Sequence, residues 1–138
     1  MSEIPLVTLD TNVLVSGLLN PHGAPGRIVD LLLSRQLRIA YDDRVFLEYR
    51  VVLSRPKFQF AQTQIDRVLS IFSYQESVFP KPWPNKLLPD PDDVVFLEVA
   101  KVSSGILISG NLKHYPKKLR RGVQVLSPAD WLAQTFGS

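Results

Sequence analysis

The hydrophobic positions alternate between short continuous runs and stretches with helical spacing. The continuous runs, rich in strand formers, predict strands over residues 4–9, 37–41, 106–109 and 123–126. The helical stretches predict helices over residues 28–35, 42–54, 63–74 and 90–103, and a short one after residue 127. Strands that alternate with helices in this way predict an α/β fold, a three-layer α/β/α sandwich with a mainly parallel central sheet.

Glycine, proline and capping residues mark the predicted boundaries. The Gly- and Pro-rich stretch Gly17–Gly26 predicts a loop, and residues 80–91, with five of the chain's 11 prolines, predict an extended connection. Asp42 or Asp43 is expected to cap the second helix, and Thr63 the third. The boundaries therefore divide one continuous alternation of strands and helices.

Length and composition narrow the class of protein. The 138 residues suit a single domain over residues 1–138, large enough for a hydrophobic core. The absence of cysteine excludes disulfides and thiolate metal sites. No signal-peptide pattern or long apolar run is present, so we expect no membrane contact and a cytoplasmic location. The net charge of +3 is too small to indicate a nucleic-acid binder by itself.

Polar residues follow two predicted strands at their carboxyl ends. Asp10 and Asn12 come directly after the first strand, and Asn111 follows the run over residues 106–109. In parallel sheets, functional sites gather at the carboxyl ends of the strands. The alternative for each residue is a local role in a cap or turn, with Asn111 in a turn at Gly110.

Other acids lie on predicted helices. Glu48 falls at the edge of an apolar helix face, which would turn its carboxylate toward the sheet, although an i,i+4 pair with Arg44 is the simpler interpretation. Asp90, Asp92 and Asp93 gather at a helix start, where acids are favoured by the helix dipole. Three acids nevertheless exceed what one cap needs, and they repel one another unless a cation lies among them.

This set of side chains suits a hard cation. Carboxylate and amide oxygens are the ligands preferred by Mg²⁺ and Mn²⁺. Zinc is disfavoured because there is no cysteine and the two histidines are His22, in a Pro-His-Gly loop, and His114. The sequence therefore predicts a site for Mg²⁺ or Mn²⁺.

The same residues, in order, resemble a known family. The run Leu9-Asp10-Thr11-Asn12-Val13-Leu14, then Glu48, then Asp90-Pro91-Asp92-Asp93, then Ile108-Ser109-Gly110-Asn111 resembles the PIN-domain ribonucleases. The resemblance is closest to the toxin components of bacterial and archaeal toxin–antitoxin systems and covers residues 7–131. It implies metal-dependent hydrolysis of RNA phosphodiester bonds, with a small antitoxin protein and further copies of the chain as candidate partners.

Positions of this family carry over to particular residues. The resemblance implies that Asp10, Glu48 and Asp93 are the catalytic metal ligands, with Asp90 and Asp92 as alternatives to Asp93 in register. Many members have Asp where this chain has Asn111, so a second metal ion is expected to bind more weakly. Asn12 is expected to support the site.

A basic stretch follows Asn111. It contains no acid, and it is expected either to contact RNA phosphates or to form a solvated loop; its cations are Lys113, Lys117, Lys118, Arg120 and Arg121. A weaker candidate group is Arg50, Arg55 and Lys57. His114 and Tyr115 are expected to stack on a base or to pack on the loop.

Three functions remain open at this point. The first is a toxin ribonuclease, and the second is a PIN nuclease in housekeeping RNA processing. The third is an RNA- or protein-binding module with weak catalysis, which Asn111 makes conceivable.

Overall fold

The computed structural model describes residues 4–84 and 87–137 and is built on one parallel sheet. The strands are β1 (Leu6–Leu9), β2 (Arg38–Tyr41), β3 (Glu76–Ser77), β4 (Ile106–Ile108) and β5 (Gln124–Leu126). Their order is β3-β2-β1-β4-β5, and every neighbouring pair is parallel. The α/β sandwich with a parallel central sheet is therefore confirmed.

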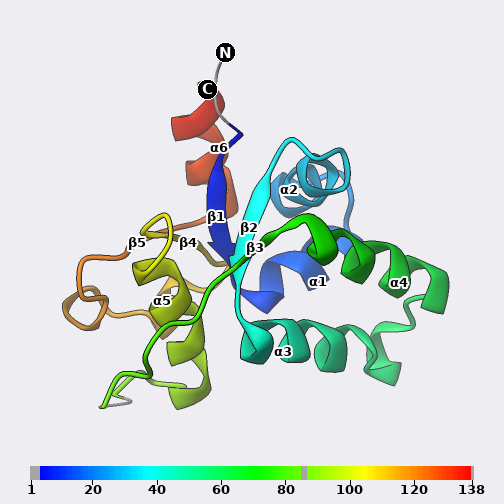
Figure 1. The fold of residues 1–138 in the computed structure, drawn as a ribbon. Helices are drawn as coiled ribbons and strands as arrows, with labels where there is room; N and C mark the ends of the chain where they lie inside the picture. Colours follow the sequence, from blue (N-terminus) through cyan, green and yellow to red (C-terminus); the bar gives the residue numbers. More distant parts are fainter. Residues whose placement is uncertain (1–3, 85–86, 138) are drawn as a thin grey trace.

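Helices cover both faces of this sheet. They are α1 (Thr11–Leu19), α2 (Ala24–Leu33), α3 (Asp43–Leu53), α4 (Gln62–Ser70), α5 (Val94–Lys101) and α6 (Pro128–Phe136). Figure 1 shows α5 on one side of the sheet and α1 and α2 on the other. Among the described residues, no helix is long and apolar enough to cross a membrane.

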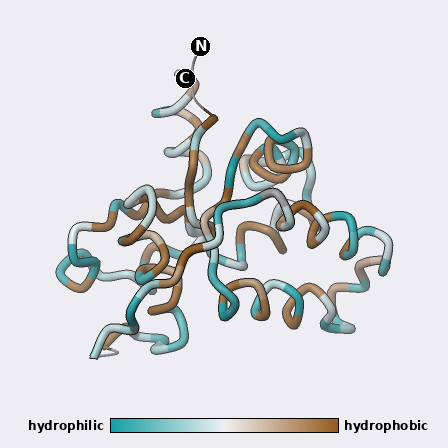
Figure 2. Tube along the Cα trace, viewed as in Figure 1, coloured by the Kyte–Doolittle hydropathy of each residue, from teal (hydrophilic) through white to brown (hydrophobic). Residues whose placement is uncertain are grey.

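The core lies between the sheet and these helices. The strand residues Val7, Leu9 and Ile39 are fully buried, and so are Leu97 and Val99 of α5. In Figure 2 the hydrophobic colour follows the strands and the helix turns next to them, while the outer loops are hydrophilic. Removal of apolar surface from water, at roughly 25 cal/mol per Å², is the main force that holds the layers together.

The predicted loop over Gly17–Gly26 is wrong, because its two ends are helical. α1 extends to Leu19 and α2 begins at Ala24, which leaves a connection of four residues. The helices pack so closely that a Cβ on Gly17 would lie 2.5 Å from a methyl carbon of Val29. Gly17 is therefore a packing residue inside a helix, not a loop residue.

Several other predicted boundaries of helices and strands differ from those in the structure. The predicted cap at Thr63 is wrong, because α4 begins at Gln62 with Ala61 in the cap position. The helix expected over residues 90–103 begins as a 3₁₀ turn, Pro91–Asp93, and continues as α5. The edge strand β3 was not predicted at all. The extended connection over residues 80–91 lies partly outside the described residues, at 85–86.

The strand order places a switch point between β1 and β4. β1 is followed in the sequence by β2 on one side, whereas β4 and β5 extend the sheet on the other side. In open parallel sheets, the crevice beyond the carboxyl ends at such a point is the usual location of a site. Asp10 follows β1 and Ser109 follows β4, so both lie at this crevice.

Candidate active site

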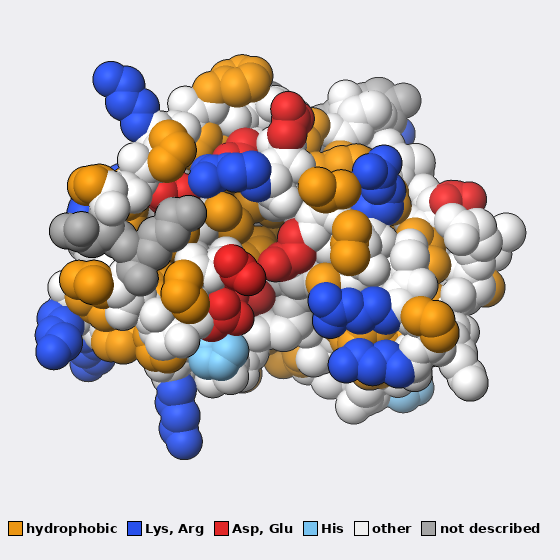
Figure 3. Space-filling model, turned by 90° about the horizontal axis from the view of Figure 1, so that it is seen from below, with side chains coloured by type: hydrophobic (Ala, Val, Ile, Leu, Met, Phe, Trp, Pro, Cys, Tyr) orange, Lys and Arg blue, Asp and Glu red, His pale blue; other side chains and the backbone are white. Residues whose placement is uncertain are grey.

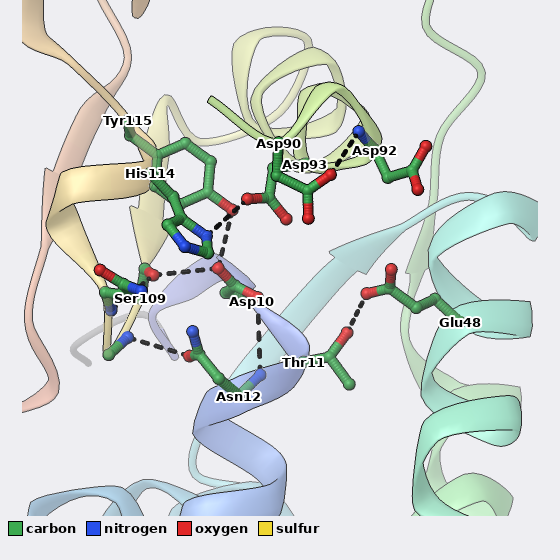
Figure 4. A network of polar contacts seen from close by, with 12 residues as sticks. Asp10, Thr11, Asn12, Glu48, Asp90, Asp92, Asp93, Ser109, His114 and Tyr115 are labelled. Atoms are coloured by element: carbon green, nitrogen blue, oxygen red, sulfur yellow. Dashed lines mark hydrogen bonds and ion pairs between the residues drawn. The ribbon is translucent and has the colours of Figure 1, made fainter. Parts of the chain in front are cut away.

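Acidic side chains gather at the carboxyl edge of the sheet. Figure 3 views this face from below and shows Asp and Glu side chains around a central hollow, with a histidine and some Lys and Arg side chains at its border and others toward the edge of the molecule. Figure 4 shows that the carboxylates of Asp10, Glu48 and Asp93 come from three elements and surround one space.

Asp10 is held in place by two hydroxyl groups. Ser109 donates a hydrogen bond to its Oδ2 at 2.9 Å, and the Tyr115 hydroxyl donates to the same oxygen at 2.7 Å. Asp10 is also the N-terminal cap of α1, where its Oδ1 lies 3.5 Å from the backbone nitrogen of Asn12. Because the donors converge on Oδ2, the carboxylate has a fixed orientation with Oδ1 less engaged.

Burial is the dominant influence on the titration of Asp10. The residue is 5% exposed, and this desolvation raises the pKa of its carboxyl group. Hydrogen bonds from Tyr115 and Ser109 oppose the rise by stabilising the charged form. Burial and the charge of Asp10 raise the pKa of Tyr115 far above its usual range, so its hydroxyl stays protonated and remains a donor.

Glu48 approaches the site from α3. Its Oε2 accepts a hydrogen bond from the Thr11 hydroxyl, the first residue of α1. Burial raises the pKa of Glu48, and the negative charge of Asp10 raises it further, against the Thr11 hydrogen bond. The local pair of Glu48 with Arg44 is wrong, since the Arg44 guanidinium binds Asp42 and Glu98 instead.

Asp93 is the acid of the 90–93 cluster that faces Asp10. Asp90 and Asp92 are exposed, and the carboxylate of Asp90 accepts the backbone N–H of Asp92 in the cap of the 3₁₀ turn. Asp93 is buried, with its Oδ2 2.8 Å from Nδ1 of His114. The geometry therefore favours Asp93 over its two neighbours as the inward-facing acid (Figure 4).

The environment of Asp93 favours its neutral form. Burial and the charges of Asp10 and Asp90 raise the pKa of Asp93 to about 7, while contact with His114 works in the opposite direction. Carboxylates with raised pKa values in one hollow repel one another in the absence of a cation. Such a set is a typical signature of a functional site.

The two asparagines differ in their contacts. Oδ1 of Asn12 accepts the backbone N–H of Gly110 at 2.9 Å, which ties the start of α1 to the end of β4. A supporting role of Asn12 in catalysis stays a prediction. Asn111 is half-buried, and its backbone N–H donates to Oγ of Ser109 at 3.0 Å. A ligand role for its amide oxygen stays a prediction.

The five basic residues after Asn111 differ in their exposure and in their contacts with the rest of the protein. Lys113, Lys117 and Lys118 are exposed. Arg120 is engaged in the fold, because its Nε donates to the carbonyl of Tyr115 at 2.7 Å. The Arg121 guanidinium lies 4.4 Å from the centre of the Trp83 ring.

Several residues of the site were missed or misinterpreted from sequence. Tyr115 cannot stack on a base, because its side chain is fully buried, and packing was the correct alternative. His114 contacts Asp93. Ser109 carried a usable signal, since it also follows a buried strand at its carboxyl end. Tyr115 carried none, because its place beside Asp10 depends on the path of an irregular loop.

A partly buried ion network joins α3, which carries Glu48, to α5, which directly follows Asp93. Nη1 of Arg44, on α3, donates to the fully buried Glu98 of α5 at 2.7 Å. The same guanidinium donates through Nε and Nη2 to Asp42, the cap of α3. The second carboxylate oxygen of Glu98 accepts the backbone N–H of Trp83. This network links α3, α5 and the connection around residue 83.

The side chains at the hollow have the chemistry of a hard-cation site. The donors are carboxylate oxygens, the ligand type that hard cations prefer, and burial raises the pKa of each of these carboxyl groups. Within residues 4–84 and 87–137, no three His, Asp or Glu side chains are already close enough to form a complete ligand set. The acids therefore fit Mg²⁺ or Mn²⁺ in type and would need to move closer together around it.

Comparison with known proteins identifies the family. The sequence model of the PIN domain family matches residues 6–113, and the chain therefore belongs to this family of nucleases. Nucleases of the family typically use divalent metal ions. An uncharacterised protein of Methanocaldococcus jannaschii is 32% identical over 108 residues, which cover 76% of this chain and 70% of the relative. No solved structure gave a significant match.

Proposed function

We propose that this protein is an Mg²⁺- or Mn²⁺-dependent endoribonuclease and the toxin of a toxin–antitoxin pair. The observation that carries the proposal is the convergence of Asp10, Glu48 and Asp93 at the switch point of a PIN-domain sheet. Burial raises the pKa of all three carboxyl groups, and the charge of Asp10 raises those of Glu48 and Asp93 further, so a divalent cation bound among them would favour their charged forms. Asp10, Glu48 and Asp93 would hold the ion, and Asn111 would contribute an amide oxygen to a second, weaker position.

The chain's own residues prepare this site. Ser109 and Tyr115 fix Oδ2 of Asp10 and leave Oδ1 available as a ligand. Thr11 orients Glu48, and His114 orients Asp93. When bound, Mg²⁺ or Mn²⁺ supplies a Lewis acid that neutralises the phosphodiester and makes water a better nucleophile.

The substrate requires positive charge beside the acids. We assign phosphate contacts to Lys113, Lys117 and Lys118, which are exposed on the loop that leaves β4 next to Asn111. Arg120 contributes by holding the backbone of Tyr115, so its effect on RNA is indirect. Contacts of this kind give affinity without sequence preference.

The toxin role rests on the family resemblance of the Asp-Thr-Asn-Val-Leu opening and the later acids. A toxin role predicts that a neighbouring gene encodes a small antitoxin protein. It also predicts a cytoplasmic location, where the protein would meet both RNA and the antitoxin. A housekeeping nuclease with the same chemistry would lack such a gene. Homo-oligomerisation remains a further prediction.

Cleavage of RNA is the direct test of the chemistry. Total RNA incubated with the purified chain should be cut when Mn²⁺ is present and remain intact in EDTA. Asp10→Asn should abolish cutting, because it removes the carboxylate that Ser109 and Tyr115 orient.

The matched control is Asp66→Asn, which changes an exposed carboxylate on α4. This variant should cut RNA at the native rate. Equal cutting by native chain and Asp10→Asn, from preparations free of contaminating nuclease, would contradict the proposal.

A further inference from the structure

A small surface pocket adjoins the acidic hollow. It has a volume of about 100 Å³ and is lined by the connection before α5, the first residue of α5 and the basic loop. Its floor is apolar, from Leu88, Val94 and Leu119, and its rim carries Lys118, Arg121 and Trp83. Pockets for drug-sized ligands are larger, about 300–1,000 Å³, so this one suits a single ring.

The aromatic wall of the pocket is fixed by a buried charge. The backbone N–H of Trp83 donates to Glu98, which is fully buried and paired with Arg44. Because a buried carboxylate must keep its partners, the position of Trp83 in the connection is strongly determined. The indole is half-buried, which leaves part of it accessible.

Contacts with neighbouring residues also hold Arg121, on the basic side of the pocket, in place. The Arg121 guanidinium lies over the Trp83 ring at 4.4 Å from its centre, a cation–π contact. Nζ of Lys101, on α5, donates to the backbone carbonyl of Arg121 at 2.8 Å. Two planar groups are thus held together beside the exposed ammonium of Lys118.

The combination matches one nucleotide of single-stranded RNA. Planar aromatic and guanidinium groups stack on bases, and because Arg121 covers one face of Trp83, a base would stack on an outer face of the Trp83–Arg121 pair while the neighbouring lysine attracts the phosphate. Val94, in the floor, directly follows Asp93, so the pocket lies next to the proposed site of cleavage.

We infer that the pocket of Trp83, Arg121 and Lys118 binds a pyrimidine base of the RNA strand next to the scissile phosphate. This inference rests on the proposed function for its substrate. It adds that the protein recognises an unpaired base, since a paired base would not present its ring to the pocket.

The test compares two octamers with equal backbone charge, measured on the full chain carrying Asp10→Asn in Mg²⁺. One is octauridylate, and the other has the same ribose phosphates without bases. Octauridylate should bind about 5- to 50-fold more tightly and should quench the fluorescence of Trp83. The other tryptophan, Trp131, is 2% exposed and serves as the unquenched reference.

Two variants test whether the base binds at Trp83. Trp83→Ala should remove the advantage of octauridylate and keep the affinity for the abasic octamer. Its backbone bond to Glu98 does not need the indole, so the connection should keep its position. Phe79→Ala is the matched control, because Phe79 is 87% exposed on the same connection and outside the pocket. It should bind both octamers as the parent does.

Equal binding of both octamers, or an equal loss in Phe79→Ala, would overturn the inference. These outcomes are separate from failure of the proposed function. RNA cleavage without base-dependent quenching would refute only the pocket, whereas base-dependent quenching without cleavage by the native chain would refute only the catalysis.

Discussion

At the scale of single residues, Asp10 depends on the hydroxyl of Tyr115. Tyr115→Phe should lower the free energy of unfolding by about 1.5–3 kcal/mol at pH 8, since it removes a hydrogen bond to a buried carboxylate. Urea denaturation measures the change. Tyr41→Phe is the control, because that hydroxyl donates to the neutral carbonyl of Phe72 in a half-buried position.

The control variant should lose only about 0.5–1.5 kcal/mol, the usual net value for a neutral hydrogen bond. Equal losses in the two variants would contradict a special role of Tyr115 in holding a charged Asp10.

Asp93 predicts a pH dependence of stability in the metal-free protein. Its pKa in the folded chain is about 7, above the ordinary value of 3.8, so the folded state binds more protons between these values. The free energy of unfolding should therefore fall as pH rises from about 4 to 7 and level off above. We expect a contribution of about 1–2 kcal/mol, reduced by solvent screening at an open site.

Asp93→Asn should reduce this fall, leaving the part that comes from the raised pKa values of Asp10 and Glu48, and should be the more stable form at pH 8 in EDTA. Urea denaturation between pH 5 and 8, with Asp66→Asn as the exposed control, measures the difference. A native chain that gains stability over this range, with no effect of Asp93→Asn, would refute the raised pKa.

At the scale of elements, Arg44 joins the helices that carry the proposed ligands. Arg44→Met should lower the free energy of unfolding by about 3 kcal/mol, the lower end for a buried pair, because it leaves the fully buried Glu98 without its cation while the Arg44 side chain itself is 39% exposed. Arg38→Met provides the control, since Arg38 forms an exposed ion pair with Glu76 at 3.8 Å and its guanidinium donates to the backbone carbonyl of Ile4 in an exposed position. That change should cost less than about 1 kcal/mol.

Thermal or urea unfolding of both variants checks this prediction. Glu98→Gln added to Arg44→Met should recover part of the loss, because the unpaired charge is then gone. A loss in Arg44→Met no greater than in Arg38→Met would show that the network does not hold the helices.

The sequence predicted elements whose pattern is amphipathic or flanked by clear caps. α3 was predicted within one residue at each end, because Asp42 is a good cap and Val45, Tyr49 and Leu53 share one buried face. α1 was missed because it has little polar face: Val13, Leu14 and Val15 are all buried. β3 was missed because its two residues are both exposed and form no alternating pattern.

The candidate site was predicted as a set of acids and not as a network. Asp10 and Asp93 could be proposed from the sequence because acids at a strand end and a helix start are local features. The contacts of Tyr115 with Asp10, 105 residues away, and of Thr11 with Glu48, 37 residues away, are set by tertiary packing. No local pattern could have predicted them.

At the scale of the whole molecule, the placement of charge predicts how RNA binding responds to salt. In the Asp10→Asn background, changing the three exposed lysines to Gln should flatten the slope of log affinity against log salt by about 2 units. The lysines are Lys113, Lys117 and Lys118. Arg120 is left in place because it supports Tyr115.

A salt series with a labelled single-stranded RNA measures the slope. Arg67→Gln, an exposed change on α4, should leave it unaltered and serves as the control. An unchanged slope in the triple variant would move the RNA path toward Arg50, Arg55 and Lys57.

The central claim is that the three carboxylates at the carboxyl edge of the sheet bind a divalent cation. Titration of Mn²⁺ into the chain at pH 8, followed by electron paramagnetic resonance of the free ion, tests it most directly. The native chain and Asp66→Asn should each take up at least one Mn²⁺ saturably, and Asp10→Asn should lose this binding. Absence of saturable binding in the native chain, or equal binding by Asp10→Asn, would contradict the claim.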